Sequence, residues 1–123
     1  MAFLDNRVFD NGLTILDTEA NVVHVTSAEA TTYAQATSTL TLGNSTSLAI
    51  AAPSERSGGG RKVTVSAISD GSITGTGTVT HYALVDTTNT RLLATAALTA
   101  SQSVTSGNTF TLASFDIGIP DPT

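Results

Sequence analysis

Cysteine and tryptophan are both missing from this 123-residue chain, and charged side chains are scarce. Without cysteine there are no disulfides, no thiolate metal ligands and no cysteine nucleophile. Charged residues make up 12% of the chain, about half of the usual share of roughly 25%. Five lysines and arginines at a formal net charge of −5 are too few to neutralise phosphates, so we expect no nucleic-acid partner.

Long apolar runs are also lacking. The N-terminal MAFLDNRVFD carries acids and Arg7 where a signal peptide needs an apolar core, and no later run approaches the length of a membrane span. We therefore expect no membrane partner and synthesis in the cytosol. Threonine, alanine and serine are abundant instead, and threonine is β-branched, so it fits a pleated strand while tolerating water. The length suits a single β-rich domain over residues 1–123.

Period-two alternation predicts most of the strands. Residues 61–98 contain three alternating runs, separated by a turn signal at Asp70-Gly71 and another at 86–89, which predicts a three-stranded antiparallel meander. Shorter strands are expected at 21–26, 39–42 and 47–52, with a loop over 27–37 and a turn at Gly43-Asn44.

The last strand changes the parity of its apolar face. Phe110 and Leu112 lie on one face, whereas Phe115 and the residues after it fall on the other. This predicts a β-bulge near Ala113-Ser114. With seven or so short strands in all, the chain is predicted to be mainly β, an antiparallel β-sandwich or small barrel with a short N-terminal helix.

The helix is expected within residues 1–18. Its apolar residues, among them Leu4, Val8 and Phe9, recur three or four positions apart and form one stripe. Gly12 costs a helix about 1 kcal/mol relative to alanine, so an end at Asn11 is an alternative. Such a stripe needs a sheet or a neighbouring subunit to cover it, which makes Leu4, Val8 and Phe9 candidate partner contacts.

Residues 54–60 form a predicted flexible, glycine-rich loop with basic flanks at Arg56, Arg61 and Lys62. A phosphate-binding loop would need a helix after its lysine, whereas Lys62 runs into the strand-like Val63-Thr64-Val65. We therefore interpret Arg56, Arg61 and Lys62 as candidate contacts to an acidic partner.

No catalytic or metal-binding constellation stands out. His24 and His81 lie mid-strand, with their nearest acids five residues away, and a structural strand histidine is the default interpretation. No Gly-x-Ser-x-Gly motif occurs, and the acids are scattered singly. We expect no enzyme, no cofactor and no metal. The six aromatics suit a core better than a sugar-binding platform.

Four segments resemble small structural proteins of tailed bacteriophage virions. They are LTILDTEANVVHVT at 13–26, TTYAQATSTLTL at 31–42, GRKV at 60–63 continuing into GTGTVTHYALVDTTNTRLLA at 75–94, and GNTF at 107–110 running to DIGIP at 116–120. The resemblance implies a virion protein made in the host cytoplasm, without catalytic residues.

The resemblance makes a capsid decoration (cement) protein the leading hypothesis: a homo-oligomer that binds the major capsid protein and stabilises the assembled shell. The alternatives are a tail-associated or fibre-attachment protein and a carbohydrate- or receptor-binding β-sandwich module, with a hydrolase as a remote one.

Overall fold

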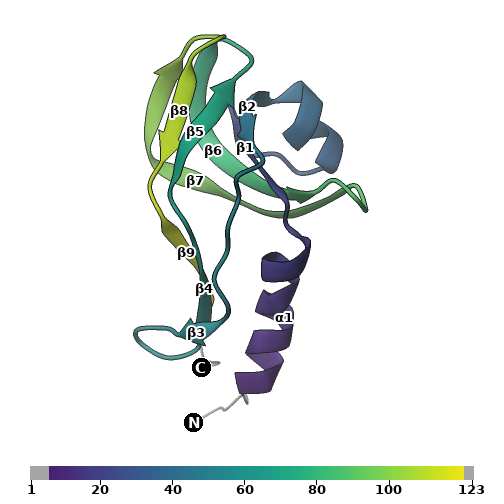
Figure 1. Ribbon diagram of the computed structural model, residues 1–123, viewed down its shortest axis with the longest axis vertical. Coiled ribbons are helices and arrows are strands. Elements are labelled where there is room, and N and C mark those ends of the chain that lie inside the picture. The colour runs from purple at the N-terminus through teal and green to yellow at the C-terminus, as the bar shows by residue number, and fades with distance from the viewer. Residues whose placement is uncertain (1–5, 121–123) are drawn as a thin grey trace. The chain divides into compact units, whose positions relative to one another are not determined.

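The computed structural model describes residues 6–120, with side chains from residue 10 onward. It confirms the predicted fold class, a mainly β chain with antiparallel pairing and one short N-terminal helix. The elements are α1 (Asn6–Glu19), β1 (Val22–Thr26), the π-helical turn η1 (Gln35–Thr39), β2 (Thr41–Ser45), β3 (Ser54–Glu55), β4 (Arg61–Val65), β5 (Ile68–Ile73), β6 (Gly77–Asp86), β7 (Arg91–Val104), β8 (Thr109–Leu112) and β9 (Phe115–Ile119) (Figure 1).

The chain forms two compact units, each assembled from separated segments. Unit 1 comprises residues 1–19, 49–67 and 113–123, and unit 2 comprises residues 20–48 and 68–112. The sequence did not predict this division, because each unit combines segments that lie far apart in the chain. The organisation as one domain stays a prediction.

Unit 2 is built on a six-stranded antiparallel sheet in the order β7-β6-β1-β2-β5-β8, curled into a half-barrel. Its centre is apolar: Val23 and Val25 of β1 and the adjoining part of β6, including Leu84, are almost fully buried. Near η1, a small cluster joins Ala36 to Val85. Consecutive residues of β1 and of the second half of β6 are buried, so both faces of these central strands are covered.

Unit 1 combines α1 with a three-stranded antiparallel sheet in the order β3-β4-β9. Val63 and Val65 of β4 are fully buried, and Leu13 of α1 is 2% exposed. The helix continues through Gly12 to Glu19, so the alternative end at Asn11 is wrong. Burial of Leu13 is worth about 1.5–3 kcal/mol, more than the cost of one helical glycine.

The predicted three-stranded meander is wrong in its first half. β6 and β7 form the expected hairpin, but β4 belongs to the other sheet and β5 pairs with β2 and β8. The supposed turn at Asp70-Gly71 lies inside β5. Gly71 pairs with Phe110, and a Cβ placed on Gly71 would overlap the Phe110 ring. The glycine is therefore used for close packing inside a strand and not for a turn.

The other strand predictions were partly wrong. Gly43-Asn44 lies within β2, the loop over 27–37 includes a helical turn that leads into η1, and residues 47–52 contain only an isolated bridge at Ile50. The parity change after Leu112 is real, but no bulge produces it. β8 ends there, and β9 begins at Phe115 in the other sheet. A change of sheet therefore accounts for the change of face.

Candidate protein-interaction surfaces

The predicted glycine-rich loop is the closed end of the β3–β4 hairpin. Gly58, Gly59 and Gly60 all have positive φ, at 91°, 104° and 93°, a backbone conformation open mainly to glycine. The Arg56 amide donates to the Gly60 carbonyl at 3.2 Å, and the Gly59 amide donates to the Arg56 carbonyl at 3.1 Å. These two bonds define the path of residues 56–60, and the half-buried Arg56 side chain lies over Gly118 of β9.

Arg61 is occupied inside unit 1. Its Nε and one terminal nitrogen donate to the two carboxylate oxygens of Asp10 on α1, at 2.8 and 3.3 Å, and its other terminal nitrogen donates to Glu55 at 2.8 Å. The hydrogen bond to Asp10 raises the pKa of Arg61. A bidentate pair of this kind fixes orientation as well as charge. Arg61 therefore joins α1 to β4, and its charge is already matched before any partner arrives.

Lys62 is paired in a similar way. Its ammonium lies 3.1 Å from one carboxylate oxygen of Asp116 on β9, whose other oxygen accepts a 2.7 Å hydrogen bond from the Thr64 hydroxyl. The hydrogen bond from Thr64 contributes most to lowering the pKa of Asp116, and the one from Lys62 contributes next. Lys62 is half-buried, and its ion pair with Asp116 links β4 to the neighbouring strand β9.

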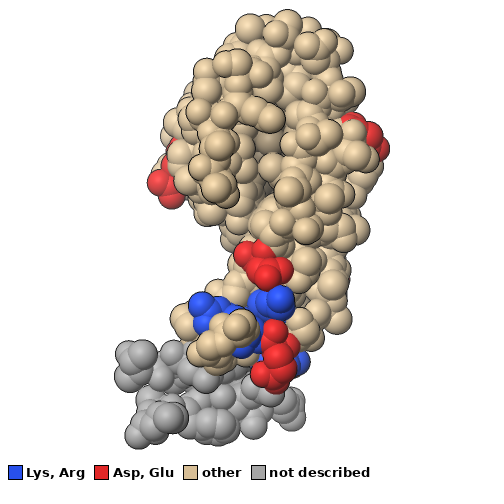
Figure 2. Space-filling view, turned by 90° about the vertical axis from the view of Figure 1, so that its left-hand side faces the viewer, with Lys and Arg blue, Asp and Glu red and all other residues tan. Residues whose placement is uncertain are grey.

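Arg56 differs from the other two cations. One of its terminal nitrogens donates to the Gly59 carbonyl at 2.9 Å, and within residues 10–120 no carboxylate pairs with it. A shallow depression of about 360 Å³ lies beside it, lined by Arg56, Ser57, Lys62, Asp116 and Gly118. Figure 2 shows Lys and Arg side chains intermixed with acidic ones in this unit. Of Arg56, Arg61 and Lys62, Arg56 is thus the one best placed to meet an external carboxylate.

The remaining predicted contacts are on the N-terminal segment. Leu4 lies outside the described residues. Val8 and Phe9 lie within α1, but their side chains are outside the described part. Two large apolar residues of unit 1 are well exposed, Ile15 of α1 at 45% and Ile119 of β9 at 38%. The sequence prediction named neither.

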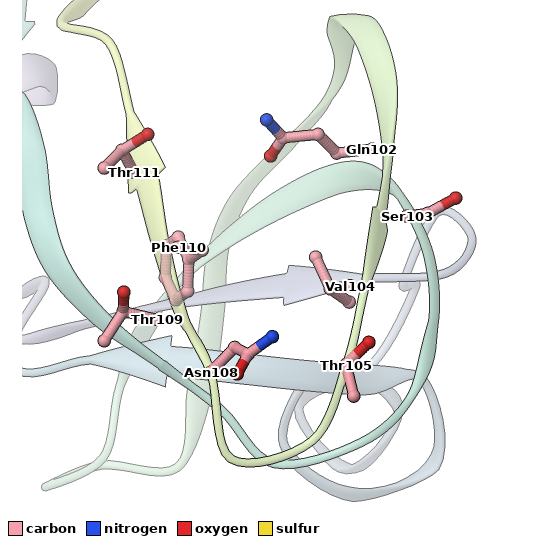
Figure 3. A pocket seen from close by; sticks show the side chains of 8 residues that line it. All are labelled: Gln102, Ser103, Val104, Thr105, Asn108, Thr109, Phe110 and Thr111. Atoms are coloured by element: carbon pink, nitrogen blue, oxygen red, sulfur yellow. The ribbon is translucent and has the colours of Figure 1, made fainter.

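The second candidate surface is formed by the two edges of the half-barrel in unit 2. β7 and β8 end the sheet order, and β7 has no buried side chain along its 14 residues. A polar groove of about 230 Å³ is lined by residues 102–105 at the end of β7 and 108–111 in and before β8 (Figure 3). Sequence reasoning missed this surface, although the absence of charge from Leu92 to Phe115 is visible in the sequence.

The histidines have local partners. His24 Nδ1 lies 2.8 Å from the Thr41 hydroxyl, and His81 Nδ1 lies 2.8 Å from the Thr80 hydroxyl. Burial lowers the pKa of His24. Within the described residues no group of three or more histidine or acidic side chains is arranged to hold a metal ion. The interpretation of both histidines as structural fits these contacts.

Of the two tyrosines, one is buried and the other is half-buried. Tyr82 is 8% exposed, and Tyr33 packs against the cluster near η1. Burial raises the pKa of Tyr82. Stacking on a sugar needs an exposed aromatic surface, which the buried Tyr82 does not offer.

Comparisons with known proteins found no family model, no curated protein and no solved structure that matches the chain. None of the helices in the described range 6–120 is long and apolar enough to cross a membrane.

Proposed function

We propose that this chain is a structural component of a tailed-phage virion, a capsid decoration protein that binds and stabilises the assembled shell of the major capsid protein. The proposal starts from the four segments that resemble virion structural proteins. One observation in the structure supports it in particular: the β3–β4 hairpin presents Arg56 without a carboxylate partner among the described side chains, on a framework held by the Arg61 and Lys62 ion pairs.

A hairpin held in this way suits recognition of an acidic group on a neighbouring subunit. Three elements converge at Arg61, namely α1 through Asp10, β3 through Glu55 and β4 itself. The backbone bonds at residues 56–60 limit the movement of Arg56 before binding, which reduces the entropy lost on association. A carboxylate placed against the guanidinium would complete a bidentate pair.

The experiment is a binding assay with purified phage shells that lack this protein. Arg56→Gln should weaken shell binding by about tenfold or more, corresponding to roughly 1.4 kcal/mol, whereas Arg56→Lys should retain part of the affinity. Ser27→Asp is the matched control, because Ser27 is exposed in unit 2 and the substitution changes the net charge by the same amount. Equal binding by Arg56→Gln and the wild type would contradict this contact.

A tail-associated or fibre-attachment role is the alternative within the same particle. Copy number separates the two: a number comparable with that of the capsid subunit indicates the shell, and a much lower number indicates the tail.

A carbohydrate-binding module is the second candidate function. The hydroxyl and amide groups that line the groove between β7 and β8 favour it. Gln102→Ala and Asn108→Ala should then abolish binding on a glycan array. An array without signal for the wild type would exclude this candidate.

A further inference from the structure

Both edges of the half-barrel come from one uncharged stretch. No charged residue and no proline occurs from Leu92 to Phe115, a segment that contains nearly all of β7 and the whole of β8. At the chain average of 12% charged residues, such a stretch would carry about three. Natural sheets usually protect exposed edges with charged side chains, prolines or coverings, because an open edge pairs with other strands. β7 lacks charges and prolines along nearly its whole length.

β7 does carry bulges, and these limit where it can pair. Leu93 is an extra residue between the Leu84–Ala94 and Val85–Leu92 pairs. Farther along, β6 advances two residues, from Val79 to His81, while β7 advances five, from Ala97 to Gln102. Bulges bend a strand and increase its local twist. The longest regular part of β7 is therefore Ala94–Ala97.

The direction of the backbone groups in this regular part follows from neighbouring hydrogen bonds. The Asn21 amide donates to the Val85 carbonyl at 3.0 Å, so Val85 turns its backbone groups toward β1. Successive residues alternate, so Leu84 and Tyr82 turn theirs toward β7. Their partners in register are Ala94 and Ala96, which therefore bond to β6.

Thr95 and Ala97 consequently point their N–H and C=O groups out of the sheet. No strand lies on that side among the described residues, because β7 ends the sheet order. Two N–H donors and two C=O acceptors thus face outward within three residues. In an antiparallel pair, opposed residues of this type exchange two hydrogen bonds.

We infer that two copies of this chain pair along β7, antiparallel, with Ala96 of each copy at the two-fold axis. In this register Thr95 of one copy faces Ala97 of the other, and the symmetry repeats the contact, giving four backbone hydrogen bonds. The small side chains of Ala94, Ala96 and Ala97 allow close approach. The resulting interface is isologous.

Charge favours a second copy as the occupant of this edge. The chain has a net charge of −5, so copies repel one another over most approaches. Along β7 beyond Arg91 neither copy presents an acid, so pairing there buries no like charges. The side chains on the two sides of the axis are the same neutral residues.

The size of the contact indicates a weak pair. Five residues centred on Ala96 extend about 16 Å at 3.3 Å per residue, and a sheet about 10 Å thick then buries roughly 160 Å² on each copy. Stable complexes bury about 800 Å² on each partner. Pairing therefore needs a high local concentration, such as that of copies bound side by side on a surface. The inference goes beyond the proposed function and does not depend on it.

The test uses the purified full chain. Sedimentation equilibrium from about 20 μM to about 1 mM should show the average mass rising from that of one chain toward that of two, as expected for a dissociation constant in the high micromolar range. Over the same range, hydrogen exchange at the Thr95 and Ala97 amides should slow several-fold, whereas the Ala94 and Ala96 amides should not change.

Ala97→Pro removes an outward N–H and should abolish both effects, whereas Ala97→Val keeps the N–H and should retain them. Ala96→Pro removes a bond to β6 and should lower the melting temperature, which checks the assigned direction. A wild-type chain that stays monomeric at about 1 mM without slowed exchange would overturn the inference. Dimerisation of Ala97→Pro at wild-type strength would do so as well.

Discussion

The contact between Gly71 and Phe110 gives the sharpest stability prediction. A Cβ on Gly71 would lie well inside the van der Waals contact distance of three Phe110 ring carbons. The ring has little room to move because Phe110 is 5% exposed. Overpacking of this kind costs about 1–3 kcal/mol. It is opposed by the roughly 0.5–1 kcal/mol that alanine gains over glycine inside a strand.

Gly71→Ala should therefore lower the free energy of unfolding by about 1–2 kcal/mol. At roughly 4 °C per kcal/mol for a chain of this size, the melting temperature should fall by about 4–8 °C. Gly75→Ala is the matched control. Its added Cβ would meet Leu42 at an ordinary 3.4 Å, so its stability should equal or slightly exceed that of the wild type.

A double-mutant cycle isolates the contact. Phe110→Leu alone should cost about 1–2 kcal/mol, because it removes buried aromatic area. Combined with Gly71→Ala, it should cost no more than Phe110→Leu alone, since the smaller side chain makes room for the new methyl group. The coupling should then reach about 1 kcal/mol or more. Urea denaturation of the four proteins measures it. Additive costs, or a stabilised Gly71→Ala, would refute the packing explanation.

Two further predictions concern a turn and a buried histidine. Thr90 has a φ of 52°, a conformation that costs a β-branched residue about 1–2 kcal/mol. Thr90→Asn should therefore raise the melting temperature, whereas the control Thr88→Asn should not. An unchanged melting temperature in Thr90→Asn would contradict this reasoning. Burial lowers the pKa of His24 below 6.5, so the stability from keeping it neutral is present above that value and is lost as the pH falls through the folded-state pKa. The melting temperature of His24→Gln should therefore fall less than that of the wild type between about pH 7 and about pH 5. Thr41→Val keeps the imidazole and should show the same fall as the wild type. Equal falls in His24→Gln and the wild type would contradict the role assigned to His24.

The sequence predicted the elements whose signal is local. β1 and the β6–β7 hairpin appear close to where alternation placed them, because apolar periodicity and a turn rich in Asp, Asn and Thr are enough to specify them. Asp86 confirms the second turn, since its carboxylate accepts from the Thr88 and Asn89 amides at 3.0 and 3.3 Å. α1 was predicted for the same reason, from its apolar stripe.

The predictions that failed concern features that depend on contacts between residues distant in sequence. Asp70-Gly71 carries a strong local turn signal, but the Phe110 ring, thirty-nine positions after Gly71, occupies the space above the glycine and keeps it in a strand. The change of sheet after Leu112 is invisible locally, because a parity change is equally compatible with a bulge.

The candidate site was only partly predictable from the sequence, because contacts between distant residues decide which cation is available. Arg56, Arg61 and Lys62 were identified together because they flank the glycines. That Arg61 is paired to Asp10, fifty-one residues earlier, leaving Arg56 as the available cation, depends on the tertiary structure. The sheet edges at β7 and β8 need the strand order, although their lack of charge could be read from the sequence.

The thermal stability of phage particles with and without this protein tests the central proposal most directly. If the chain is a capsid decoration protein, particles from a phage lacking its gene should release DNA at a lower temperature and in low salt, because a protein that binds only the assembled shell stabilises that shell. Adding back the purified wild-type chain should restore stability, whereas Arg56→Gln should restore less. Particles of unchanged stability, with the protein present in only a few copies, would contradict the proposal.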